Sequence, residues 1–190
     1  MAGSVPTWAT ERPEVLPHDP GLALRARAEA ARLAEILAPW LVDGIEHVGS
    51  TAVPGLAAKP IIDLMASASD PGAVVTEAAD ALAADGWNYV PPELDQRDWR
   101  RFYVKPDAAG ERRLAHLHVI PAGHPRWAQQ IAFRDALRGD DRLARAYEDV
   151  KRRASAQHHD DREAYTSAKT KFVMDVLASV SPGLSRYHST

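Results

Sequence analysis

The sequence has 190 residues, of which 45% are hydrophobic and 26% charged, values that suit one folded domain with a sizeable core. It contains no cysteine, which excludes disulfides, thiolate catalysis and Cys-ligated zinc. The net charge of -3 argues against general nucleic-acid binding. Since no apolar run is long enough to cross a membrane and no secretion signal is visible, we expect a cytoplasmic protein without membrane contact.

The charge is unevenly distributed along the chain. Residues 97–153 contain 14 Lys and Arg against 8 Asp and Glu, whereas the remainder is acidic. Two interpretations are open: solvated helix faces, or a local anion-binding surface on an acidic protein.

The expected elements begin with a proline-rich arm over residues 1–18, followed by one domain over 19–180 and a tail over 181–190. Asp19-Pro20 is typical of a helix start, and apolar residues at helical spacing continue to Pro39. Further elements follow from apolar periodicity and turn residues. We expect strands at 41–48, 59–66, 86–90, 101–105 and 114–120, and helices at 71–84, 125–138, 141–154 and after Asp160.

This order predicts an α+β fold. Regular alternation of strands and helices fails after residue 86, which argues against a doubly wound sheet. The expected architecture is a mixed sheet with helices packed on one face and a C-terminal helical segment.

The turn Gly49-Ser50-Thr51 is the first candidate ligand site. Glycine lets the main chain approach a ligand closely, and hydroxyl groups beside it can bind phosphate. Lys59, ten residues from the turn's start, can add a point charge. The sequence therefore indicates a phosphate cradle, although many such turns only connect strands.

Asp63 is the strongest single candidate. An ionised carboxylate on an otherwise apolar strand is costly unless a cation or several donors satisfy it. Ligand or metal binding is one interpretation. The alternative is that Asp63 accepts N–H groups from the preceding turn and only fixes that loop.

Histidines provide further candidates. His47 precedes the turn, and His116 and His118 share one face of a later strand. If they lie near Asp63, they can serve as metal ligands, with Asp63, His47 and His118 as the expected set, or in acid–base catalysis by Asp63, His116 and His118. Structural hydrogen bonding of neutral imidazoles is the alternative. Glu46 is a spare acid, which alternation puts on the face opposite His47.

Other basic and aromatic residues are expected near a ligand. Arg134, inside a helix, can bind a phosphate through its planar fork or pin that helix to the sheet by pairing with a carboxylate. Trp99 can stack a base beside Arg100 and Arg101, or lie at the rim of a groove.

Residues 46–64, with His116-Leu-His118-Val and Phe133-Arg134-Asp135 downstream, resemble the GrpB family over most of residues 20–178. The resemblance implies the polymerase-β-like nucleotidyltransferase fold. It also implies Lys169 as a phosphate-binding residue, for which a solvated helix surface is the alternative.

Active nucleotidyltransferases of this fold place a Gly-Ser turn before a strand with two carboxylates one residue apart. Gly49-Ser50 matches the turn and Asp63 matches the first carboxylate, but Met65 stands at the second position and cannot bind Mg²⁺. Two functions are therefore expected. One is a nucleotidyltransferase using NTP and Mg²⁺, Mn²⁺ or a histidine-bound transition metal, acting on a small molecule or protein. The other is a non-catalytic module for a nucleotide or CoA-like ligand.

Overall fold

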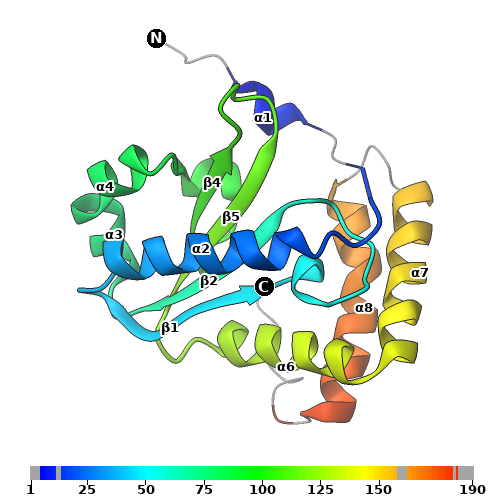
Figure 1. Ribbon diagram of the computed structural model, residues 1–190. Helices are drawn as coiled ribbons and strands as arrows, with labels where there is room; N and C mark the ends of the chain where they lie inside the picture. Colours follow the sequence, from blue (N-terminus) through cyan, green and yellow to red (C-terminus); the bar gives the residue numbers. More distant parts are fainter. Residues whose placement is uncertain (1–4, 12–13, 158–161, 182, 184–190) are drawn as a thin grey trace.

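The computed structural model describes residues 5–11, 14–157, 162–181 and 183. Its centre is a five-stranded sheet in the order β1-β2-β5-β4-β3 (Figure 1). The strands are β1 Leu41–Val48, β2 Ile62–Ala68, β3 Asn88–Val90, β4 Arg101–Pro106 and β5 Arg113–Pro121.

The sheet is mixed, as expected. β2 runs parallel to β5, whereas β1–β2, β4–β5 and β3–β4 are antiparallel. β2 thus has a neighbour on each side, which agrees with its apolar sequence. In the β2–β5 register Asp63 lies opposite His116, and Met65 lies opposite His118. The topology therefore brings together residues more than fifty positions apart.

One face of the sheet is covered by α2 Gly21–Ile36, α3 Pro71–Glu77 and α4 Ala79–Ala84. The expected helix at 71–84 is divided at Ala78, which ends α3 and precedes α4. Asp70 starts α3 because its carboxylate accepts the N–H groups of Gly72 and Ala73. Apolar side chains of the three helices and the inner sheet face form the main core, which includes Leu22, Leu33, Leu37, Leu64, Val74, Leu82, Tyr103 and Leu117.

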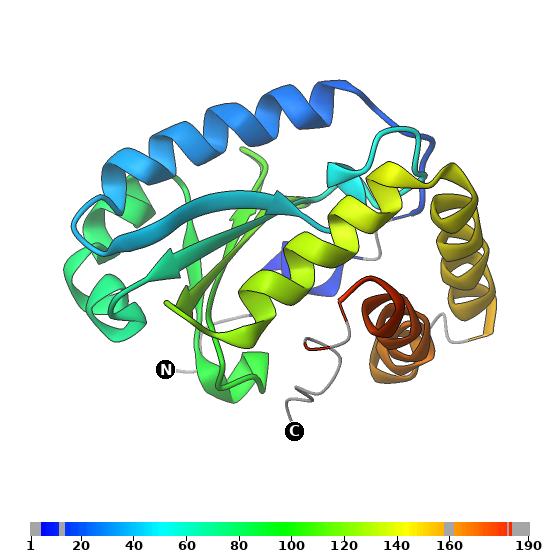
Figure 2. The same ribbon diagram turned by 90° about the horizontal axis from the view of Figure 1, so that it is seen from below.

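The opposite face is approached by α6 Pro125–Gly139, so that the sheet lies between α2 and α6 (Figure 2). α7 Asp141–Gln157 and α8 Arg162–Val180 pack beside α6 and form the expected C-terminal helical segment. Asp160, the expected start of the last helix, lies outside the described residues. A second core joins these helices to the loop before β2 and includes Val53, Leu56, Phe133, Leu137, Tyr147 and Leu177.

The N-terminal segment is tied to the domain at two points. It contains the short helix α1 Thr7–Thr10. Leu16 and Ala58 exchange two main-chain hydrogen bonds of 2.9 and 3.0 Å, and the Glu11 carboxylate accepts the N–H of Arg113 at 2.8 Å. The segment expected as an extended arm therefore contacts the domain. Within the described residues, no helix has the length and apolar character needed to cross a membrane.

Candidate functional site

The candidate site begins at the end of β1, where the chain turns sharply. Gly49 has φ 73° and ψ -172°, a conformation that is essentially restricted to glycine. It is followed by the 3₁₀ turn η1 Ser50–Ala52. A Cβ atom at Gly49 would lie only 2.6 Å from Oδ2 of Asp63. The turn and the carboxylate are thus in direct contact, and glycine is required for both conformation and space.

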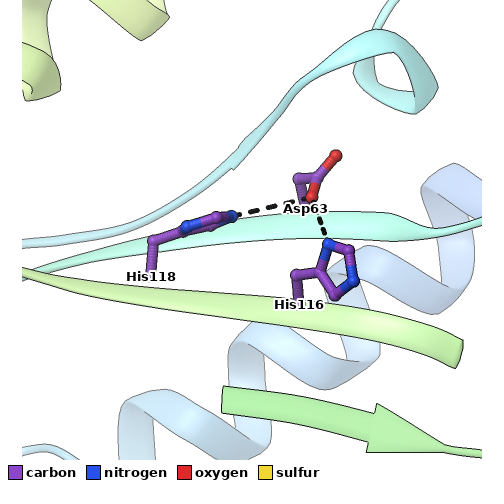
Figure 3. A group of neighbouring side chains, drawn as sticks. All are labelled: Asp63, His116 and His118. Atoms are coloured by element: carbon purple, nitrogen blue, oxygen red, sulfur yellow. Dashed lines mark hydrogen bonds and ion pairs between the residues drawn. The ribbon is translucent and has the colours of Figure 1, made fainter. Parts of the chain in front are cut away.

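The Asp63 carboxylate is shared by two histidines. His116 Nδ1 lies 3.0 Å and His118 Nε2 lies 3.6 Å from the same oxygen, Oδ1. Figure 3 shows both rings directed at this oxygen, while Oδ2 points away from them. The Asp63 side chain is 31% exposed, and among the described residues its hydrogen-bond partners are His116 and His118, with no main-chain N–H. The alternative that Asp63 only fixes the turn through main-chain N–H groups is therefore not what the structure shows.

Burial of Asp63 would by itself raise its pKa, but hydrogen bonding to His116 and His118 outweighs burial and lowers the pKa well below its ordinary value. Burial lowers the pKa of His118 to about 4, and the charge of Arg100 acts in the same direction. At neutral pH the site therefore contains an ionised carboxylate beside a neutral His118 imidazole.

Arg100 determines which His118 nitrogen carries the proton. Its guanidinium is 7% exposed and binds Asp95 through Nε–Oδ2 at 2.8 Å and through Nη2–Oδ1. Its Nη1 contacts Nδ1 of His118. Because a guanidinium only donates, Nδ1 must accept and the proton of the neutral ring must be on Nε2, facing Asp63. The result is a continuous chain from Asp95 through Arg100 and His118 to Asp63.

Met65, at the position of the second carboxylate, is buried in an apolar cluster. It is 2% exposed and packs with Val48 and Ile120, against which Trp99 and Trp127 also pack. The space that a second acidic side chain would need is therefore occupied by hydrocarbon and indole rings.

His47 and Thr51 lie apart from this group. His47 is opposite Leu64 in the β1–β2 register and so faces the α2 side of the sheet. Its Nε2 is 3.0 Å from the Thr51 hydroxyl, which donates to the Ile61 carbonyl at 3.1 Å. Thr51 is only 3% exposed. Both side chains thus stabilise the turn from behind, and His47 does not belong to the group within metal-binding distance of Asp63. Burial lowers the pKa of His47 to about 4, although the Asp63 charge acts in the opposite direction.

Glu46 shares the face of Asp63, because it lies opposite Met65 in the register. Glu46 and His47 lie on opposite faces, as alternation predicts, but Glu46 and not His47 is on the same face as Asp63. Arg134 on α6 binds the Glu46 carboxylate and donates to the His47 carbonyl at 2.9 Å. Arg134 is only 8% exposed, and these contacts attach α6 to β1. This is the second of the two roles expected for Arg134, in place of a phosphate contact.

The remaining candidates lie around the turn. Ser50 is partly buried, and its hydroxyl has no hydrogen bond with a described residue. Lys59 lies in the loop before β2 and is partly buried. Lys169 on α8 lies close enough to Lys151 to lower the pKa of that lysine, for which burial is the larger cause. Sequence reasoning missed Asp95, which belongs to no motif.

The donor atoms do not fit the two-cation centre of nucleotidyltransferases, because Met65 replaces one carboxylate. They also do not fit a transition metal at the imidazoles. A metal-binding histidine directs its other N–H to an acceptor, but the other nitrogen of His118 faces Arg100, a donor. The other nitrogen of His116, Nε2, is buried without a hydrogen-bond partner among the described residues. Asp63, His116 and His118 lie within metal-binding distance of one another, but their outer contacts oppose such a role.

Solved structures place this architecture among known folds. The structure of Cid1 poly(U) polymerase with Mg 3′-dATP bound superposes with a TM-score of 0.54 at 11% identity, over 80% of this chain and 49% of that chain. The conserved protein GrpB from Enterococcus faecalis superposes with a TM-score of 0.70 at 26% identity, over 87% of this chain and 98% of that chain. The chain therefore has a nucleotidyltransferase-like fold.

The sequence comparisons narrow this class. The family model described as GrpB protein matches residues 12–179. The UPF0157 protein PA4798 of Pseudomonas aeruginosa is 39% identical over 172 residues, which are 88% of this chain and 67% of that relative. The chain thus spans about two thirds of the length of this relative. It belongs to the GrpB family.

Proposed function

We propose that the chain binds the phosphate part of a nucleotide-type ligand between the Gly49-Ser50 turn and Asp63. The observation that carries the proposal is the division of the Asp63 carboxylate. Oδ1 is occupied by two histidines, while Oδ2 lies against Gly49 on a side chain that is 31% exposed. One ionised oxygen is thus held in position against Gly49, the residue before Ser50, without a second protein partner in the described part of the chain.

A single divalent cation fits this arrangement. Mg²⁺ prefers oxygen ligands, retains several waters and is commonly held by one or two carboxylates together with substrate phosphates. Asp63 Oδ2 would hold the cation that accompanies the phosphates, and Ser50 would donate to a phosphate oxygen. The Cid1 structure contains Mg 3′-dATP, which makes a magnesium nucleotide the first ligand to test and a CoA-type ligand the second.

Nucleotidyl transfer to a small molecule or protein is the second candidate function. It is favoured by the ionised Asp63 beside His116, since a carboxylate and an imidazole in contact can accept a proton from an attacking hydroxyl. Against it stands Met65, whose apolar surroundings remove the second cation that aligns attacking and leaving oxygens. The geometry supports binding better than transfer.

Isothermal titration calorimetry of the full chain with MgATP, MgGTP and CoA tests the proposal. Asp63→Asn should weaken the tightest ligand about tenfold or more, because a charge-assisted contact is lost. Ser50→Ala should weaken it by a smaller factor. Asp175→Asn is the matched control, because this aspartate on α8 is 65% exposed and pairs only with Lys171 among the described residues.

The outcomes are distinct. Ligand binding that is weakened in Asp63→Asn and unchanged in Asp175→Asn supports the proposed site. Absence of binding for every ligand, or equal binding by Asp63→Asn and wild type, refutes it. Pyrophosphate release from radiolabelled NTP with Mg²⁺ or Mn²⁺, lost in Asp63→Asn, would establish transfer in place of binding alone.

A further inference from the structure

Arg126, the second residue of α6, differs from the other partly or fully buried arginines near the candidate site. Arg100 is neutralised by Asp95 and Arg134 by Glu46 and Asp135. Arg126 is partly buried, and its Nε is fully buried without a hydrogen-bond partner. In the described part of the chain no carboxylate forms an ion pair with it. Its charge is thus uncompensated where compensation matters most.

The surroundings of Arg126 increase this cost. Burial lowers the pKa of Arg126, and the charges of Arg97 and Arg100 lower it further. Among the described residues no acidic group opposes these effects on Arg126, although the charge of Asp98 acts on the neighbouring His124 and raises the pKa of that imidazole. The neighbouring His124 also has a lowered pKa, through burial first and the charge of Arg126 second. Several basic groups therefore converge on one small region, within the segment 97–153 whose sequence has a surplus of positive charge.

Trp99 holds this region in place. The Arg126 guanidinium carbon lies 5.3 Å from the Trp99 ring centroid, and that of Arg100 lies 5.1 Å from it. The rings of His118 and His124 stack on Trp99 at 6.4 and 6.0 Å. The indole stabilises the cations through its π system, so Arg126 is already oriented without an anion. Because two guanidinium groups and two imidazole rings already lie against the indole, the structure favours a supporting role for Trp99 over stacking on a ligand base.

We infer that Arg126, beside Trp99 and His124, forms a binding site for a phosphate group, separate from Asp63 but next to it through the Trp99–His118 stack. A guanidinium binds phosphate through paired, charge-assisted hydrogen bonds. The buried Nε shows that the protein does not satisfy this side chain, and the Nη groups, which have no hydrogen bond with a described residue, are the donors that a phosphate can reach. The phosphate is either free inorganic phosphate or a second phosphate group of the ligand proposed for Asp63; only the latter assignment rests on that proposed function.

Thermal unfolding and calorimetry of the full chain with inorganic phosphate, at constant ionic strength with chloride as the reference anion, test the inference. Wild type should be stabilised by phosphate in a saturable manner. Arg126→Met should bind phosphate about tenfold more weakly or worse. It should be at least as stable as wild type without phosphate, because a buried uncompensated charge is removed. The control is Arg152→Met, since Arg152 is 63% exposed and paired with Glu148.

A purely structural role for Arg126 gives a different result. The variant would then lose the same stability at every phosphate concentration, which would overturn the inference, as would equal phosphate stabilisation of Arg126→Met and wild type. If the variant does not fold, the ¹⁵Nε resonance of Arg126 in wild type still decides. It should shift with phosphate and not with chloride, and an unchanged resonance would overturn the inference.

Two further arms identify the source of the phosphate. If Asp63→Asn retains phosphate binding while Arg126→Met loses it, the anion site is independent of the proposed nucleotide site. If Arg126→Met also weakens MgATP or CoA, the site receives a second phosphate of that ligand. If the nucleotide proposal is wrong, Asp63→Asn will bind nucleotide as wild type does. The loss of phosphate binding in Arg126→Met would still be observed, so the two failures can be told apart.

Discussion

Replacement of Gly49 by alanine tests the contact between the turn and the carboxylate. The backbone at φ 73° and ψ -172° should cost about 1–3 kcal/mol for a residue with a side chain. The added Cβ would also lie 2.6 Å from Asp63 Oδ2, so the carboxylate must move away from His116. Loss of that charged hydrogen bond adds about 1.5–3 kcal/mol. We expect a total loss of unfolding free energy of about 2.5–6 kcal/mol.

Gly44, inside β1, provides the control. It has φ 87°, but a Cβ there would meet nothing within 4 Å, so Gly44→Ala reports the backbone term alone, about 1–2 kcal/mol. Urea denaturation gives both values. In an Asp63→Ala background, the cost of Gly49→Ala should fall towards its backbone term of about 1–3 kcal/mol, because the close oxygen is gone and only the Cβ of residue 63, 3.2 Å away, remains. Equal penalties for Gly49→Ala with and without Asp63 would refute the reasoning.

Replacing Asp95 by Asn and Arg100 by Gln together should free His118 to change tautomer. The affinity for Co²⁺, measured by visible absorption, should then rise about tenfold or more. An unchanged Co²⁺ affinity would contradict the tautomer assignment. His118 has a native pKa of about 4 against 6.5 for the free side chain, so the unfolded chain takes up the proton first. The stabilisation is therefore complete above pH 6.5 and is lost as pH falls toward 4, by on the order of 3 kcal/mol; His118→Gln should reduce this loss in pH-dependent urea titrations, and an unaltered slope would speak against it. Lys151→Ala should lower stability by about 1.5–3 kcal/mol, because its buried ammonium donates to a carbonyl in the loop before β2, whereas exposed Arg152→Ala should change it by less than about 1 kcal/mol; similar values for the two would show that the buried contact is unimportant.

Much of the fold could be predicted because periodicity and turn residues act locally. The apolar run around Asp63 indicates a central strand, and Asp70-Pro71 indicates a helix start; both are confirmed. The division of the following helix at Ala78 has no strong local signal, since alanine favours helix. The N-terminal contacts could not be predicted either, because Leu16 and Ala58 pair across a long sequence separation.

The site was predictable only in part, for a physical reason. Alternation along a strand predicts which residues lie on opposite faces. It does not predict which of the two faces is shared with the functional residues of the neighbouring strand, because that depends on the pairing register. Hence His116 and His118 were correctly expected on one face, whereas the expected approach of His47 to Asp63 depends on register, which gives that side to Glu46. The pairing of Arg100 with His118 depends on β4–β5 register in the same way.

We propose that Asp63 offers one oxygen to a ligand-bound cation. Anomalous diffraction at the manganese edge, from crystals grown with a Mn²⁺–nucleotide complex, would locate that cation. We expect a single manganese peak next to Asp63 Oδ2, away from both imidazoles, with phosphate density over the Gly49-Ser50 turn. Two peaks at this position, a peak bonded to His116 or His118, or a nucleotide bound elsewhere would contradict it.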